Sequence, residues 1–415
     1  MKSIRIGLLL GWRQIQRASI WTTVLIIFVM MLTFLNLIAV SGVLVGLIEG
    51  SERAVQKTSL GDIVLSVKDE EDHILETTSV IETLTTFPEI STYSVRYKGS
   101  AQLEANYKER RDLSGDRDIV TSVVTGIDPL QEEAMTELSS TLIEGEYLDP
   151  TEEGHILIGA YFIKRYAQQF GDVFESLEGV YPGDTVRLTV GDTSKEFIVK
   201  GIIQSKVDEV NLNTYIPELE FRRIFGRFDR NADQIVTRLE PGVDPDKTKA
   251  ALLATGLGEF AKIQTFQESL PKFLIDIKNT FNLLGTMIGS IGLVVASITI
   301  FIIIFINALS RRRHIGILKG IGITRQAIEL AYVLQAAFYA LLGSLLGALL
   351  TYGVLIPYFD KNPINFPFSD GILVADPEET FIKFVILFII TLVAGFIPAW
   401  MIVRQNTLNS ILGRK

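Results

Sequence analysis

Four long stretches of the chain contain no charged residue. They lie between Arg17 and Glu49, Lys278 and Arg311, Glu329 and Asp360, and Lys383 and Arg404. A helix of roughly 20 apolar residues crosses the bilayer core, and each stretch reaches that length. The pattern therefore predicts four transmembrane helices, at residues 18–48, 280–309, 329–358 and 380–403. The first is too long for a signal-peptide core and ends without an Ala-x-Ala site, so we expect it to be retained.

The region between the first two predicted spans, residues 49–279, has a different pattern. Thr185–Val190 alternates apolar and polar residues, Gly191-Asp192 follows as a turn, and Phe197–Ile203 returns, which predicts a β-hairpin. Further strands are predicted at 61–67, 122–128 and 232–239, helices at 159–169 and 246–255, and a polar loop at 112–118. These elements predict a two-part α+β domain. The fold class is therefore a membrane α-helical protein with a large α+β extracytoplasmic domain inserted between transmembrane helices 1 and 2.

Most basic residues near the predicted spans lie on one side of the membrane. The residues that precede the first span are Lys2, Arg5, Arg13 and Arg17, and those between the second and third spans are Arg311, Arg312, Arg313, Lys319 and Arg325. Arg404, Arg414 and Lys415 follow the fourth span. The loop at 359–379 is rich in acidic residues instead: Asp360, Asp370, Asp376, Glu378 and Glu379. The positive-inside bias places the lead-in helix (1–17), the segment 310–328 and the tail (404–415) in the cytoplasm. Residues 49–279 are then extracytoplasmic, in a multi-pass protein of the cytoplasmic (inner) membrane.

The charge and the polar residues of the chain exclude several classes of function. The formal charge is −9, only six of the 48 acidic residues lie outside residues 49–279, and no cysteine occurs. An acidic exposed domain argues against nucleic acid as a partner. No metal-ligand or catalytic spacing surrounds His73 or His155, so no catalytic, cofactor-binding or metal-binding residue is predicted. The spans offer only uncharged polar candidates, chiefly Asn36, Asn307 and Gln335, which is unlike an ion channel or secondary transporter.

Two glycine pairs in the spans have a spacing that permits close helix contact. Gly285-x-x-x-Gly289 lies in the second span and Gly343-x-x-x-Gly347 in the third. Such pairs pack helices within a bundle or against a second subunit, and the sequence leaves both interpretations open.

The segment Ser310–Ile328 combines a basic cluster with periodic apolar residues. Ile315, Leu318 and Ile321 share one face of a short helix, beside Arg311 and His314. An amphipathic helix of this kind suits docking into the groove of a cytoplasmic partner. The same residues also suit a basic loop that only anchors the topology, and the physical pattern alone does not decide between the two.

The segment resembles the loop after the second span in ABC-transporter permeases of the macrolide-exporter (MacB), lipoprotein-releasing (LolC and LolE) and cell-division (FtsX) family. The family pattern is a basic cluster, Glu-Ile-Gly-Ile-Leu, a basic residue, a small residue and Leu-Gly. The matching residues are Arg313, Ile315, Gly316, Ile317, Leu318, Lys319 and Gly322, while His314 replaces the glutamate, Gly320 the alanine and Ile321 the leucine. The residues of the exposed region that are similar to the family's extracytoplasmic core are 124–128, 144–147, 156–159, 182–186 and 197–203.

The resemblance implies a permease that works with a separate cytoplasmic ABC ATPase and with a second permease, as a homodimer or a heterodimer. ATP is then bound by the partner, and the chain itself lacks a G-x-x-x-x-G-K-[ST] motif. The implied ATPase-coupling residues are Arg313, His314, Ile315, Gly316, Ile317, Leu318, Lys319 and Gly322. ATP-driven movement is expected to reach the extracytoplasmic domain through the spans (mechanotransmission) and to drive export or release of a lipoprotein, peptide or drug-like substrate.

Two other functions remain open at this point. An FtsX-like regulator would use the same machinery to switch a periplasmic or extracellular partner such as a cell-wall hydrolase. A receptor or scaffold unrelated to ATP would need no ATPase. Membrane lipid is an expected partner in each of these cases. The size of the exposed region favours the transporter over the regulator.

Overall fold

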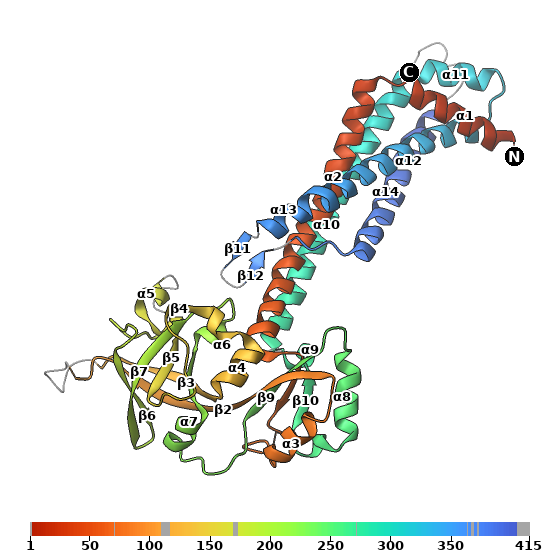
Figure 1. Cartoon of the computed structure of the whole chain (residues 1–415). Helices are drawn as coiled ribbons and strands as arrows, with labels where there is room; N and C mark the ends of the chain where they lie inside the picture. The colour runs from red at the N-terminus through yellow and green to blue at the C-terminus, as the bar shows by residue number, and fades with distance from the viewer. Residues whose placement is uncertain are drawn as a thin grey trace. The chain divides into compact units, whose positions relative to one another are not determined.

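The computed structural model describes residues 2–69, 71–108, 117–168, 173–270, 272–362, 364–366, 369–371 and 373–404 (Figure 1). The chain forms two compact units. The helical unit contains residues 1–50, 273–366 and 370–415, and the α+β unit contains residues 51–272 with 367–369. Each unit is described by itself below.

Four helices of the described chain are long and apolar enough to cross a membrane. The first is α2 (Ile20–Val55), which a π-helical turn at Gln56–Leu60 extends, and the second is α10 (Lys272–Ser310). The third is α12 (Arg325–Leu350), which passes through a π-helical turn at Thr351–Leu355 into α13 (Ile356–Lys361), and the fourth is α14 (Pro377–Val403). At 1.5 Å per residue, α2 and α10 are each more than about 50 Å long, well beyond the bilayer core.

The rest of the helical unit consists of short elements. An amphipathic helix, α1 (Lys2–Gln16), precedes α2, and α11 (Arg312–Gly320) joins α10 to α12. Two three-residue strands, β11 (Ile364–Phe366) and β12 (Ser369–Gly371), pair with each other ahead of α14. The four long helices and α11 contribute to one buried apolar cluster, which includes Met30, Ile304, Ile315, Tyr332 and Ala399.

The α+β unit is built on one ten-stranded sheet with the main strand order β10-β1-β9-β2-β3-β8-β5-β7-β4, while β6 pairs with β2 and β7. Its strands are β1 (Ile63–Ser66), β2 (Ile90–Glu104), β3 (Ile119–Ile127), β4 (Leu142–Gly145), β5 (His155–Gly159), β6 (Thr185–Val190), β7 (Thr193–Ile203), β8 (Asn213–Pro217), β9 (Gln234–Leu239) and β10 (Lys262–Thr265). Its helices are α3 (Thr77–Leu84), α4 (Pro129–Thr136), α5 (Lys164–Ala167), α6 (Asp208–Asn211), α7 (Glu218–Ile224), α8 (Pro245–Ala254) and α9 (Phe266–Ser269).

The two parts that the sequence predicts for this domain share the long strand β2. Its first half, from Ile90 to Arg96, pairs with β9, and its second half, from Arg96 to Glu104, pairs with β3. One apolar core runs across both halves, with Leu65, Val124 and Phe197 essentially inaccessible to solvent. The predicted hairpin is confirmed as β6 and β7, with Val186 and Leu188 fully buried. The fold class predicted from the sequence is therefore confirmed.

The predicted helix at residues 159–169 is wrong. Strand β5 continues to Gly159, a 3₁₀ turn spans Ala160–Phe162, and α5 has only four residues, while Gln169 lies outside the described residues. The reason is tertiary: the backbone of Phe162 and Lys164 is hydrogen-bonded to Leu177, at 2.7 and 3.0 Å, so it is unavailable to a longer helix. Most of the predicted loop at 112–118 also lies outside the described residues, which resume at residue 117.

Candidate functional site

The helix α11 follows α10, and only Arg311 separates the two helices. Arg311 leaves helical geometry, with φ −100° and ψ 12°, although its amide still donates to the carbonyl of Asn307 at 3.2 Å. The amide of Ile315 then donates to Arg311 O at 3.0 Å and starts the new helix. Because no acidic residue occurs between positions 310 and 328, this whole connection is cationic.

A Schellman motif ends α11. Gly322 has φ +93°, a left-handed conformation that favours glycine. Its amide donates to Lys319 O at 3.1 Å, and the amide of Ile323 donates to Leu318 O at 3.0 Å, which are the two hydrogen bonds of that motif. Leu318 and Ile323 also both pack against the apolar cluster of the helical unit. Gly322 therefore gives α11 a sharp end and starts the turn into α12.

Buried apolar residues fix α11 to the membrane helices. Ile315 is only 3% exposed, Gly316 is buried, and Leu318 packs on the same cluster. Ile315 is thus covered by this chain and Leu318 is partly covered, so both residues anchor the helix on the bundle. Their predicted part in docking a partner stays a prediction.

Lys319 makes a second attachment. Its Nζ donates to the carbonyl oxygen of Val403 at 3.0 Å, at the last turn of α14. The final carbonyls of a helix lack intrahelical partners, and a cation there complements the helix dipole. Burial, together with the nearby charge of Arg325, lowers the pKa of Lys319. Lys319 thus connects α11 to α14.

The lead-in helix α1 lies along α12 (Figure 1). A Cβ added at Gly7 would lie 2.9 Å from Ala327 O, and one added at Gly11 would lie 2.8 Å from Leu334 Cδ2. The two helices therefore touch through a Gly-x-x-x-Gly pair that the sequence analysis missed. The same spacing singled out the two pairs in the spans, so that criterion applied to residues 2–16 would have found it.

The opposite side of α11 is open. Arg313 and His314 are exposed, Ile317 is 47% exposed and Ile321 is 71% exposed. We call these four residues the exposed coupling face. Arg313, Ile317 and Ile321 follow one another at intervals of four residues, so they lie on one side of the helix. The face offers two apolar side chains and a cation, which suits recognition of a partner rather than chemistry.

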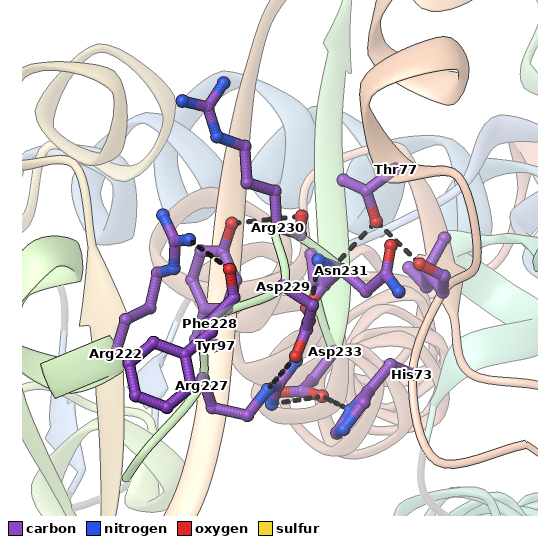
Figure 2. A network of polar contacts seen from close by, with 12 residues as sticks. His73, Thr77, Tyr97, Arg222, Arg227, Phe228, Asp229, Arg230, Asn231 and Asp233 are labelled. Carbon is purple, nitrogen blue, oxygen red and sulfur yellow. Dashed lines mark hydrogen bonds and ion pairs between the residues drawn. The ribbon is translucent and has the colours of Figure 1, made fainter. Parts of the chain in front are cut away.

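The histidine His73, in the α+β unit, belongs to a network of polar contacts (Figure 2). Its Nδ1 lies 2.6 Å from Asp233 Oδ1, and Asp233 Oδ2 accepts a hydrogen bond from the backbone amide of Lys98 at 2.6 Å. Arg227 Nη1 lies 3.3 Å from the same carboxylate. Figure 2 shows these side chains converging on Asp233 from separate segments of the chain. The network fixes the loop before β9 to β2, which is a structural role.

Two family models match the chain. The MacB-like periplasmic core domain matches residues 23–255, more than half of the chain, and the FtsX-like permease C-terminal domain matches residues 286–407. The second match contains α11 and all eight predicted coupling residues.

Relatives with curated names agree with these models. The chain is 24% identical over 210 residues to the macrolide export ATP-binding/permease protein MacB of Pasteurella multocida, covering 49% of this chain and 31% of that protein. It is 26% identical over 207 residues to the probable export ATP-binding/permease protein MacB of Pseudomonas entomophila, covering 48% and 30%. The chain thus spans about a third of the length of these relatives.

Two solved structures resemble the fold at low similarity. They are the periplasmic region of MacB from Actinobacillus actinomycetemcomitans (15% identity, TM-score 0.37, 51% of this chain and 92% of that one) and the extracellular domain of the noncanonic ABC-type transporter YknZ from Gram-positive bacteria (14%, 0.33, 49% and 97%). At these TM-scores the two structures carry no argument for the assignment. With four membrane-spanning helices, an inserted α+β domain and both family models in the expected order, the chain belongs to the MacB/FtsX family of ABC transporter permeases.

Proposed function

We propose that this chain is a permease subunit whose exposed coupling face docks on a separate ABC ATPase in the cytoplasm. The observation that carries the proposal is the division of labour within α11. Ile315, Leu318 and Lys319 hold the helix on the bundle, while Ile317 and Ile321 remain exposed beside Arg313. Exposed isoleucines on a rigidly held helix are costly to leave in water, and a partner's apolar groove would cover them.

The charge distribution supports a cytoplasmic position for this face. The segment 310–328 and the flanks of α1 and α14 carry basic residues, whereas the loop before α14 is acidic. By the positive-inside bias, both termini and α11 then lie in the cytoplasm and the α+β domain lies outside. Arg404, at the end of α14, also stacks on the ring of Trp400 with 4.2 Å to the ring centre, an arrangement typical of the membrane interface.

The packing of α11 supports mechanotransmission as the mode of action. Ile315 shares one buried cluster with residues of all four long helices, including Met30 of α2 and Ile304 of α10. Because packed interiors are stiff, a displacement of α11 by an ATPase would be passed to these helices. Helices α2 and α10 lead directly into the α+β domain, so they are the route by which that movement would reach it.

The substrate would be moved on the outer side of the membrane, by export or by release from it. We assign a lipid-linked, peptide or drug-like molecule to this role, and a second permease, identical or related, as the partner within the membrane. The match of residues 23–255 to the MacB-like core supports the transporter over a regulator of an external hydrolase.

A pull-down from native membranes tests the ATPase partnership. Ile317 and Ile321 are replaced together by alanine in the tagged chain, which removes apolar contact area without adding charge. We expect the wild type to recover a soluble ABC ATPase, and the double variant to lose most of it. Losing two partly buried isoleucines at an interface costs roughly 2–4 kcal/mol.

Gln326→Ala serves as the control, because Gln326 is exposed in the first turn of α12 and is not part of the exposed coupling face. Equal recovery of the ATPase by the double variant and the control would contradict the proposal. Replacing Ile315 or Leu318 would not be informative, because a charge buried there would damage the bundle itself.

A further inference from the structure

Helix α1 contacts α12 with only one of its sides. Gly7 and Gly11 are buried in that contact. Ile4, Leu8 and Trp12 follow one another at intervals of four residues, so they form a stripe on an adjacent side of α1. These three side chains are 56%, 45% and 54% exposed. About half of this apolar stripe is therefore left uncovered by the chain itself.

The side of α1 that faces away from α12 carries positive charge. Arg5 and Arg13 lie on that side by the same helical spacing, and both are exposed. Arg17 follows directly after the helix and is exposed as well. No acidic residue occurs in the first 48 positions, and the single acid of α12, Glu329, is balanced in formal charge by Arg325. The surface that α1 presents is therefore cationic beside its apolar stripe.

The stripe continues into the first membrane span. Only residues 17–19 separate α1 from α2, whose first residues Ile20 and Trp21 are 78% and 86% exposed. Tryptophan is enriched where lipid headgroups meet acyl chains, and Trp12 and Trp21 lie on either side of this short connection. Exposed apolar side chains beside a span are costly to leave in water, and lipid would cover them.

We propose that α1 binds anionic phospholipids at the membrane surface, with Ile4, Leu8 and Trp12 at the boundary of the acyl chains and Arg5 and Arg13 at the headgroup phosphates. Burial of the apolar stripe favours contact with any lipid, whereas the net charge of the headgroup supplies the selectivity. A zwitterionic headgroup carries the same phosphate, but its own ammonium group cancels the charge. The inference goes beyond the proposed docking role, because it concerns a separate surface and needs no ATPase.

Fluorescence quenching by brominated lipids tests the site on the full chain in nanodiscs. Trp21→Phe and Trp400→Phe leave Trp12 as the only tryptophan of the three. The discs contain equal amounts of phosphatidylglycerol and phosphatidylcholine, and the acyl chains of one lipid or the other carry bromine. We expect brominated phosphatidylglycerol to quench Trp12 about threefold more strongly, because arginines near an anionic surface attract it.

Two results would overturn the proposal. Equal quenching by the two lipids would show that α1 contacts lipid without selecting the headgroup. Quenching by neither lipid would place Trp12 in water and leave the stripe open to a soluble partner.

Variants of the two arginines locate the selectivity. Arg5→Gln with Arg13→Gln should be quenched equally by both lipids, with the total quenching retained because the apolar stripe is intact. Arg5→Lys with Arg13→Lys keeps both charges and should keep the preference. Lys361→Gln is the control, because it removes an exposed charge at the far end of the helical stretch Arg325–Lys361 and should change nothing. An undiminished preference in the glutamine variant, or a lost preference in the lysine variant, would contradict the proposal.

The assay contains neither ATP nor an ATPase, and both faces of a nanodisc have the same lipids, so its result depends on neither the docking test nor the proposed topology. Selective quenching together with a failed pull-down would leave the lipid site standing and overturn the docking role. A successful pull-down without selective quenching would do the reverse.

Discussion

Strand β1 of the α+β unit buries Ile63, Val64 and Leu65 almost completely, whereas α10 leaves Ile291 and Val295 more than half exposed. Both segments are rich in apolar residues. In the domain, water forces such side chains into the core, and the pattern of apolar residues therefore reports which face is buried. In the helical unit, lipid is as apolar as the side chains, so the pattern predicts that a helix spans but not which face packs. There, glycines and small residues decide the packing.

The two regions also treat polar groups differently. The α+β unit buries an ion pair, in which Arg96 Nη2 lies 2.6 Å and Nε 3.0 Å from the oxygens of Glu132, with Ser94 and Thr136 as further donors. The charged groups Lys319 and Lys383 of the helical unit are at the ends of α11 and α14, where they reach Val403 and Glu379. The comparison shows that buried polar contacts add to the apolar core in the α+β unit, whereas close backbone approach at glycines contributes in the helical unit.

The largest expected effect is in the α+β unit. Glu132→Gln leaves the buried Arg96 charge without its counterion, which typically costs about 3–5 kcal/mol. We expect the unfolding transition of this domain to move to markedly lower temperature. Arg223→Gln is the control, since its pair with Glu153 is exposed on both sides and should shift the transition little. Similar transitions for the two variants would show that the buried pair does not stabilise the fold.

The same pair predicts a pH dependence. Burial raises the pKa of Glu132, but the charge of Arg96 and the hydrogen bonds from Arg96, Ser94 and Thr136 outweigh it, so the net pKa lies below 4.5. This stabilisation is present above pH about 4.5 and is lost as pH falls through the lower, folded-state value. The melting temperature of Glu132→Gln should therefore change less between pH 7 and pH 3 than that of the wild type. A difference between the two proteins that grows as pH falls would contradict this assignment.

A smaller effect is expected from the glycines of the helical unit. Gly343→Leu places a side chain where Met30 Cβ lies 2.3 Å away, so α2 and α12 must separate, at a cost of about 3 kcal/mol. Gly285→Leu has room, because the atom nearest to an added Cβ lies 3.6 Å away, and should change the melting temperature in detergent far less. The measurement is size-exclusion chromatography of each variant after heating, which reports how much folded protein remains. Equal losses of folded protein in Gly343→Leu and Gly285→Leu would mean that the two glycine pairs pack alike.

The smallest effect concerns the end of α11. Gly322→Ala must adopt φ +93° with a side chain, which costs about 1 kcal/mol. Because no atom lies within 4 Å of the added Cβ, the cost is backbone strain alone. We expect ATPase recovery in the pull-down to fall severalfold while the melting temperature barely changes. Gly320→Ala is the control: it has the same open surroundings within the helix and should leave recovery intact.

Much of the fold could be predicted from the sequence, for reasons that particular elements make plain. The spans follow from the absence of charge, and the hairpin β6–β7 follows from alternation and the turn at Gly191. Helix α8 begins where Asp244 caps it and Pro245 occupies its first turn. The short helix α5 was mispredicted because Phe162 and Lys164 bond to the distant Leu177.

The candidate site was harder to predict from the sequence than the fold, because α11 carries apolar residues on both sides. Ile315 and Leu318 fall on one face and Ile317 and Ile321 on another, and periodicity alone does not say which face the bundle covers. That choice is made by tertiary contacts, including the bond from Lys319 to Val403. The coupling role of all eight residues stays a prediction.

A single introduced cysteine tests the central claim most directly, because the chain has no other thiol. In Ile317→Cys, a membrane-impermeant maleimide should label inside-out vesicles and not right-side-out ones, and bound ATPase should protect the thiol. The buried position in Ile315→Cys should label poorly from either side. Labelling of Ile317→Cys from the outer side, or labelling that bound ATPase leaves unchanged, would contradict the account.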